Sequence, residues 1–224
     1  MGGKQARLER TERARPPAGA HRRRAGGTAE SIAEAALQIL ADEGVQAVTM
    51  HRIAQQLAIT PMAIYYYYQD RDALLQHIVN LEIVRLAKLG AQLVASSTDA
   101  DREHIIDAYL DYAFSRPHVF DYVFNTPREG GMKYPEDFRA RKSPSLNTVA
   151  DRVEYFMRAG LILTDDIWEV TMQLWAHAHG YVALYRSGRF SFDESEFRVL
   201  YRRAMTRLFT GLAPASTGPD AAIP

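Results

Sequence analysis

Hydrophobic side chains recur every three or four positions along most of the chain, the spacing that places them on one face of an α-helix. No stretch alternates apolar and polar residues for long enough to indicate a β-strand. The pattern predicts an all-α fold of about nine helices, at residues 29–43, 50–58, 61–68, 71–97, 101–115, 117–124, 145–159, 165–187 and 194–211.

Capping residues mark the limits of these helices. Thr28 stands at the N-cap of the first helix, where a hydroxyl accepts a backbone N–H, and Gly44 ends that helix. Thr60 and Pro61 occupy the N-cap and first position of the third helix. Asp70 precedes the fourth helix, and three later helices are expected to be capped by Asp99, Thr164 and Asp193.

The second and third helices are short, and only about three residues separate them, which is typical of a helix-turn-helix. The second helix of such a unit enters the major groove, with its first side chains at base edges and its N-terminal amides at phosphate. Ile64 and Tyr68 lie four residues apart and suit the core side. The groove-facing side is then expected to carry Thr60, Met62, Ala63, Tyr65, Tyr66 and Tyr67.

Four successive tyrosines occupy positions 65–68, and four successive residues of a helix point in four directions. Tyr65, Tyr66 and Tyr67 are therefore expected to offer hydroxyl groups that bind phosphate oxygens without carrying charge. The alternative is that all four rings pack in the core, where each buried hydroxyl would also need a hydrogen-bond partner.

The charge is unevenly distributed, although 27 basic residues balance 27 acidic ones. Residues 1–27 hold eight basic and two acidic residues and almost no large aliphatic side chain, which predicts a disordered basic arm. Residues 28–80 hold two basic and six acidic residues, and residues 81–224 hold seventeen and nineteen. The breaker-rich residues 213–224 predict a flexible tail, which leaves a head at 28–75 and a larger helical unit at 76–212.

Several classes of protein are excluded or disfavoured. The chain has no cysteine, so disulfide scaffolds, thiolate metal sites and cysteine nucleophiles are excluded. Neither a Gly-x-Ser-x-Gly elbow nor a phosphate-binding glycine loop occurs, and we expect no enzyme and no cofactor. No apolar run is long enough to span a bilayer, so we expect a cytoplasmic protein with no membrane contact.

Residues 32–75 resemble the N-terminal DNA-binding domain of the TetR family of transcriptional regulators. The resemblance rests on Ile32, Ala35, Ala36, Gly44, Thr49, Ile53, Ala54, Ile59, Thr60, Ile64, Tyr65, Tyr67, Asp70, Leu74 and Leu75 at intact spacing. It implies that DNA is a partner. The residues that it places at DNA are Thr49, Met50 and His51 at the start of the second helix, Met62 and Ala63 at bases, and Tyr65, Tyr66, Tyr67 and Arg71 at phosphates.

Three residues depart from the family pattern. Ala58 stands where glycine is usual, so the turn after the second helix must accept a Cβ atom. Tyr68 replaces a common phenylalanine, and Arg71 replaces a usual lysine. Arg71 keeps the positive charge, so none of the three changes removes a DNA-binding group.

The acidic head should be repelled by DNA at long range. Helix N-termini supply partial positive charge that a residue count omits. The basic arm precedes the first helix, and Arg22, Arg23 and Arg24 fit a role in the adjacent minor groove. A solvated tail without a DNA contact fits the same composition.

The resemblance also implies a ligand-binding and dimerisation domain after residue 81. Trp175, His179 and Gly180 form a W-x3-H-G pattern similar to one subclass of such domains. Trp175 and His179 lie four apart and can share the wall of a cavity, whereas an ordinary packed Trp and a hydrogen-bonded His fit equally well. His177 and His179 point to nearly opposite sides of a helix, which disfavours a metal site.

Aromatic residues are frequent in this domain, and a cavity lined by aromatics suits a small, largely apolar effector. The residues expected to line it are Tyr109, Tyr112, Phe124, Met172, Trp175 and His179. The Pro- and Gly-rich segment 125–144 is expected to be a mobile loop over or beside this cavity.

The last two helices carry broad apolar rows, which indicate more apolar surface than one subunit needs. The resemblance implies that these helices pair with those of a second copy in a homodimer interface. The rows comprise Trp168, Met172, Trp175, His179 and Val182, and Phe197, Leu200, Tyr201, Ala204, Met205, Leu208 and Phe209. The resulting hypothesis is a dimeric repressor that a small-molecule effector releases from a palindromic DNA operator, by a shift of the long fourth helix. The alternatives are an activator of the same fold, and an all-α small-molecule-binding protein or enzyme that does not bind DNA.

Overall fold

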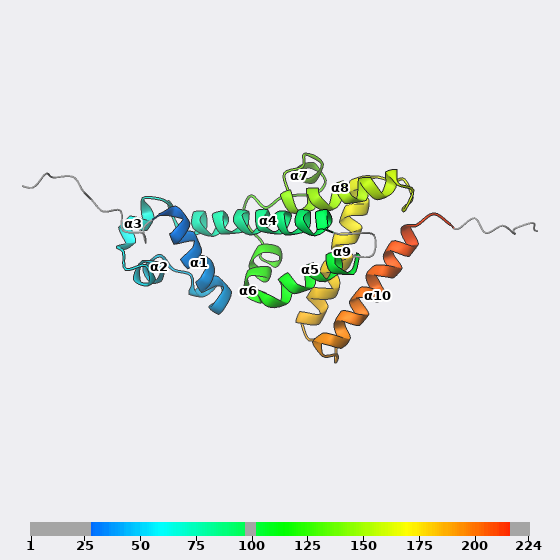
Figure 1. The fold of residues 1–224 in the computed structure, drawn as a ribbon. Helices are drawn as coiled ribbons and strands as arrows, with labels where there is room; N and C mark the ends of the chain where they lie inside the picture. Colours follow the sequence, from blue (N-terminus) through cyan, green and yellow to red (C-terminus); the bar gives the residue numbers. More distant parts are fainter. Residues whose placement is uncertain (1–27, 97–101, 216–224) are drawn as a thin grey trace, which may run out of the picture.

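The computed structural model describes residues 28–96 and 102–215, and within those ranges the regular structure is helical with no strand (Figure 1). The all-α prediction is confirmed. The ten α-helices of the described residues are α1 Ala29–Glu43, α2 Met50–Gln56, α3 Pro61–Tyr65, α4 Arg71–Ser96, α5 Arg102–Ser115, α6 Pro117–Phe120, α7 Glu136–Arg139, α8 Pro144–Arg158, α9 Ile167–Arg186 and α10 Glu194–Leu212. The predicted arm, most of the predicted tail and the expected cap Asp99 lie outside the described residues.

Helices α1 to α3 and the first turns of α4 form the head. The Thr28 hydroxyl accepts the Ser31 N–H at 3.2 Å, and the Ser31 side chain accepts the Thr28 N–H, so both N-terminal donors of α1 are satisfied. Gly44 ends α1 with φ 85°, a left-handed conformation that favours glycine. The interior of the head is aliphatic, and Ile32, Leu40, Ile53, Ile64 and Leu74 are fully buried there.

The turn between α2 and α3 adopts the geometry that the sequence required. Ala58 has φ 52°, so the Cβ atom of an alanine occupies a left-handed position. Its N–H donates to the Gln55 carbonyl at 3.2 Å, and the next N–H, from Ile59, donates to Ala54 at 3.0 Å. These bonds satisfy the last carbonyls of α2 and offset part of the strain at Ala58.

Helix α4 is 26 residues long and runs from the head into the larger unit, where it lies against α8 and α5 (Figure 1). Its Glu82 side chain has no exposed surface. One carboxylate oxygen accepts from Arg116 at 2.7 Å and from the Tyr112 hydroxyl at 3.3 Å, and the other accepts from Arg85 at 3.1 Å. Since Tyr112 belongs to α5 and Arg116 follows it, this carboxylate fixes α4 to α5.

Three predicted elements differ in detail. The third helix, expected at 61–68, ends at Tyr65, so Tyr66 and Tyr67 lie in the turn that follows α3. The helix expected at 117–124 is a single turn, α6, followed by the π-helix Asp121–Asn125. The segment 125–144, expected to be a loop, contains the short helix α7, whose Phe138 side chain is buried. Burial of this ring against α9 organises the segment in a way that its Pro and Gly content did not indicate.

One prediction about the last helices was wrong, and the dimer interface expected there stays a prediction. Asp166, not Thr164, caps α9, because its carboxylate accepts the N–H groups of Trp168 and Glu169. The apolar rows of α9 and α10 were expected to exceed the needs of one subunit. Most of them pack within the chain instead, and Phe197 and Tyr201 are almost completely buried.

Replacement of Glu82 by alanine should lower the free energy of unfolding by about 3 kcal/mol, because Arg116 loses its partner in a buried site. Urea unfolding followed by circular dichroism measures the change. Glu34→Ala, at an exposed position of α1, is the control and should shift stability by less than about 0.5 kcal/mol. Equal effects of the two substitutions would contradict the structural role of the buried carboxylate.

Candidate DNA-binding head and ligand cavity

The surface of α3 faces solvent as the sequence predicted. Met62 is 76% exposed, and Tyr65, Tyr66 and Tyr67 are 47%, 83% and 43% exposed. Ile64 and Tyr68 are buried, and the Tyr68 hydroxyl donates to the Ala29 carbonyl at 3.0 Å. The run of four tyrosines thus divides into one structural ring and three surface rings.

The N-termini of α2 and α3 have similar caps. Thr49 accepts the Arg52 N–H at 3.2 Å, and Thr60 accepts the Ala63 N–H at 3.3 Å. Both threonines are exposed, and Ala63 is half-buried. Further N–H groups at each of these helix starts have no partner within the helix and suit an anion such as phosphate.

The residues predicted at the start of α2 do not all reach the surface. His51 is exposed, whereas the Met50 side chain is only 8% exposed and packs in the core of the head. The prediction that Met50 contacts DNA with its side chain was therefore wrong. Thr49 and His51 remain the accessible groups at this helix start.

Both arginines of residues 28–80 are engaged within the head. Arg52 donates to the Glu43 carboxylate, with one contact at 2.8 Å. Arg71 donates to the carbonyls of Val48 and Val45, at 2.6 and 2.5 Å. Arg71 therefore holds the short 3-10 turn Val45–Ala47 against the start of α4. The predicted contact of Arg71 with a DNA phosphate has to form while its guanidinium stays bound to these two carbonyls.

Arg22, Arg23 and Arg24 lie outside the described residues, so their predicted contact with the minor groove stays a prediction. Within the described head, the surface of α3 presents uncharged groups. These are hydroxyls of tyrosine and threonine, together with the amides of the helix starts. The predicted DNA contact of this surface would therefore depend on hydrogen bonding more than on charge.

The larger unit contains a cavity of about 990 Å³. Its wall is built by α4, α5, α8, α9 and α10 and by the segment that precedes α8. The volume lies at the upper end of the range typical of small-molecule sites. The cavity is therefore large enough for an extended effector.

Three of the six predicted cavity residues line it, namely Tyr109, Phe124 and Trp175. Tyr112, Met172 and His179 do not, and their placement there was wrong. Tyr112 points to the Glu82 carboxylate, and Met172 packs against the cluster around Phe138. The predicted loop does contribute, through residues such as Met132 and Phe138.

His179 lies behind the cavity wall and joins two elements. Its Nδ1 atom is 2.9 Å from the Tyr109 hydroxyl, and its Nε2 atom is 2.9 Å from the Asn125 side-chain oxygen. The Asn125 amide donates to Asp121, so its oxygen must accept from Nε2–H and the Tyr109 hydroxyl must donate to Nδ1. Burial lowers the pKa of His179 and raises that of Tyr109, which keeps both groups neutral.

Sequence reasoning missed much of the aliphatic part of the cavity. Helix α4 contributes Ile83, Leu86, Leu89 and Leu93, and α10 contributes Met205. Leu86 and Leu89 were visible as part of an apolar face of the fourth helix. Nothing in that spacing distinguishes a face that lines a cavity from one that packs without a gap.

Within the described residues, no group of three His, Asp or Glu side chains has the geometry of a metal site, and no helix is long and apolar enough to cross a membrane.

Comparison with known families identifies both parts of the chain. The family model described as bacterial regulatory proteins, tetR family, matches residues 32–78, and the one described as tetracyclin repressor-like, C-terminal domain, matches residues 103–208. The chain belongs to the TetR family of transcriptional regulators. It is accordingly a DNA-binding regulator and not an enzyme.

Solved structures share this TetR-family fold. A protein of unknown function from Rhodococcus sp. RHA1 aligns with TM-score 0.70 and 17% identity, covering 83% of this chain and 95% of that one. A TetR family transcription regulator from Marinobacter aquaeolei VT8 gives 0.59 and 18%, covering 80% and 93%. FadR from Bacillus subtilis, in complex with stearoyl-CoA, gives 0.65 and 13%, covering 82% and 99%. No curated protein matches the chain.

The matched C-terminal model does not test the subclass that the W-x3-H-G pattern suggested, so that assignment stays a prediction. The structure gives each residue of the pattern a place. Trp175 lines the cavity, His179 supports its wall, and a Cβ atom at Gly180 would meet no atom within 4 Å.

Replacement of Tyr66 by phenylalanine should weaken binding of the TetR-family head to a DNA duplex about tenfold, the worth of one hydrogen bond to a charged oxygen. Fluorescence anisotropy with a duplex selected from a random pool measures the affinity. The dependence of affinity on salt should not change, because no charge is lost. Tyr68→Phe is the control, since it removes a hydroxyl that bonds within the head. If Tyr66→Phe bound the duplex as tightly as the unmodified chain, the hydroxyl of Tyr66 would not contact DNA.

Protonation of His179 should destabilise the folded chain at acidic pH. Because the pKa of His179 is lowered in the folded chain, this side chain takes up a proton at a higher pH in the unfolded chain, near pH 6.5. The free energy of unfolding therefore falls as the pH drops below about 6.5. His179→Asn, which keeps an acceptor for Tyr109, should lose less stability between about pH 7.5 and about pH 5.5 than the unmodified chain. Urea unfolding at both pH values measures the difference, and equal losses would contradict it.

Proposed function

We propose that the chain is a ligand-responsive repressor that binds a palindromic DNA operator as a homodimer and is released by a small, largely apolar effector. The observation that carries the proposal is the position of the cavity. Its wall includes α4 from Ile83 to Leu93, and the same unbroken helix begins in the head at Arg71. A regulator of this kind acts where its DNA is, so the expected cytoplasmic location belongs to the same proposal.

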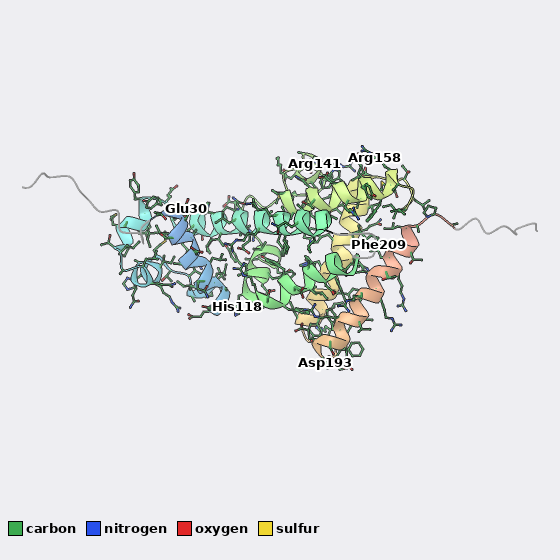
Figure 2. All side chains as sticks on the ribbon, in the orientation of Figure 1. Glu30, His118, Arg141, Arg158, Asp193 and Phe209 are labelled. Carbon is green, nitrogen blue, oxygen red and sulfur yellow. The ribbon has the colours of Figure 1, made fainter. Side chains whose placement is uncertain are left out.

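Two contacts support transmission from the cavity to the head. The first is α4 itself, which Arg71 fixes to the 3-10 turn of the head. The second is α6, which packs against α1, and His118 of α6 lies 3.5 Å from the position of a Cβ atom at Gly44 (Figure 2). Phe124, in the π-helix that continues α6, lines the cavity. An effector that moves this wall therefore acts on both connections.

The effector shifts the head only by binding one arrangement of these helices more tightly than the other. The relative FadR from Bacillus subtilis was solved with stearoyl-CoA, which is consistent with a large ligand in a protein of this fold. In the present chain an aliphatic cavity lies between α4 and α10.

The test combines a cavity readout with a DNA readout. Trp168→Phe leaves Trp175, which lines the cavity, as the one indole of the chain, so its emission reports binding of dodecanol as an apolar probe. Anisotropy of a labelled, selected duplex reports DNA binding. Occupancy of the cavity should weaken the duplex complex about tenfold, as expected for a coupling of typical size.

The matched variants are Ala178→Phe, which places a ring in the cavity wall, and Ala159→Phe, which places one on the surface. Only Ala178→Phe should abolish both probe binding and release. Duplex affinity that is unaffected by an occupied cavity would contradict ligand response. A chain that binds the probe and no duplex would instead support the alternative of a small-molecule-binding protein without DNA binding.

The homodimer is proposed to form through the outer face of α9 and α10, which lie together at one edge of the molecule (Figure 1). Although the residues of the predicted rows are buried or half-buried, Leu184 of α9 and Val199 of α10 are 49% and 52% exposed. Exposed aliphatic side chains on neighbouring helices suit a symmetric contact with a second copy.

The variant that carries both Leu184→Glu and Val199→Glu should be a monomer, because charge on this face opposes burial. Light scattering should give about 25.3 kDa for the double variant and about twice that mass for the unmodified chain. Met62→Glu is the control, since Met62 is also exposed but belongs to the head. A dimeric double variant would place the interface elsewhere.

A further inference from the structure

The described side chains that line the cavity carry charge of one sign. Arg128, Lys133 and Arg152 line it, and no aspartate or glutamate among the described side chains does. The remaining wall is aliphatic and aromatic, with a few hydroxyl groups. A largely apolar site that contains cations attracts an anion, because charges beside an apolar wall are screened less than charges in bulk water.

Arg152 of α8 differs from Arg128 in its hydrogen bonds: within the described residues its guanidinium makes none, whereas Arg128 donates to two carbonyls. The Nε atoms of both are buried without a partner. The guanidinium of Arg152 lies 4.8 Å from the ring centre of Tyr155 and 4.5 Å from that of Phe156. In the described part of the chain, no carboxylate pairs with this side chain.

Most other arginines of the larger unit do pair with a carboxylate. They include Arg85, Arg116, Arg139, Arg141, Arg158, Arg186, Arg198 and Arg202. On α8 itself, Arg158 binds Glu154 one turn earlier and lies at the outer end of the helix (Figure 2). Arg152 and Arg158 therefore differ in their partners although they belong to the same helix.

Arg128 has a different role. It donates to the carbonyls of Tyr122 and Val123, the latter at 2.9 Å, and so clamps the π-helix. Burial lowers its pKa. Because its two terminal nitrogens are already occupied, Arg128 adds positive potential to the cavity but offers fewer donors than Arg152.

We propose that the effector is an anionic amphiphile, an apolar chain or ring system that carries one carboxylate, and that Arg152 binds this carboxylate. The proposal rests on the effector cavity of the proposed function and names its ligand class. A carboxylate satisfies two guanidinium donors at once and supplies the counter-charge that the wall lacks. The aliphatic wall accommodates the apolar part.

The geometry also orients the ligand. A Cβ atom at Gly90 would lie 3.4 Å from Thr148 of α8, which places this part of α8 beside the second half of α4. Arg152 lies one helical turn after Thr148 on α8. On α4, the lining residues run from Ile83 to Leu93, and these ten residues span about 15 Å along the helix. The acid group therefore lies toward the end of α4, and the apolar part extends back toward Ile83 and the head.

The test uses three probes with one chain length and different head groups: dodecanoate, dodecanol and dodecylamine, each below its micelle concentration. Emission of Trp175 in the Trp168→Phe chain reports their affinities at neutral pH. Dodecanoate should bind about ten- to hundredfold more tightly than dodecanol, and dodecylamine most weakly. Arg152→Gln should bring the affinities of dodecanoate and dodecanol together, whereas Arg152→Lys should keep part of the preference.

Arg158→Gln is the matched control on the same helix and should keep the full preference for dodecanoate. Unchanged dodecanol binding in Arg152→Gln reports that the cavity is intact, so loss of fold does not imitate the effect. Equal affinities of the three probes in the unmodified site, or a preference for dodecanoate that survives Arg152→Gln, would overturn the proposal. These binding measurements test only the chemical class of the ligand. The proposed regulation is tested separately, by whether an occupied cavity changes the affinity for the duplex.

Discussion

The buried carboxylate of Glu82 holds the DNA-binding head and the larger unit in one arrangement. It lies in the middle of α4, the helix that both parts share, and it accepts from Arg116 and Tyr112. Arg116 is the residue before α6, and α6 packs against α1 of the head. The cost of leaving this charge unpaired therefore links the position of α4 to that of α6. The cavity wall and the contacts with the head both depend on that link.

The arginines of the head and the arginine Arg152 of the cavity differ in whether their charge is paired. In the head, Arg52 and Arg71 are bound to a carboxylate and to carbonyls, and the exposed face of α3 presents phenols and helix starts. In the cavity, Arg152 has no carboxylate partner among the described residues. Placement of these few arginines thus distinguishes the uncharged surface that we propose to contact DNA from the cavity that we propose to bind an acid, in a chain whose total charge is zero.

Local sequence signals predicted the fold of the head and much of its surface. The Thr60–Pro61 start and the pairing of Ile64 with Tyr68 depend on residues close together in the chain, and the structure has both. Met50 and Arg71 were placed by resemblance alone, whereas their burial and bonding depend on α1 and the 3-10 turn. The cavity was predicted in part because aromatic residues are conspicuous in a sequence. Its aliphatic members and the unpaired Arg152 follow only from the packing of several helices.

Coupling between the cavity and the DNA surface is the central claim, and thermodynamic reciprocity tests it directly. The measurement is the affinity of dodecanoate for the free protein and for the protein saturated with its selected duplex, both read from Trp175 emission. If cavity and head are coupled through α4 and α6, the duplex weakens dodecanoate binding by the same factor by which dodecanoate weakens duplex binding. Equal dodecanoate affinities in the two states would contradict the coupling.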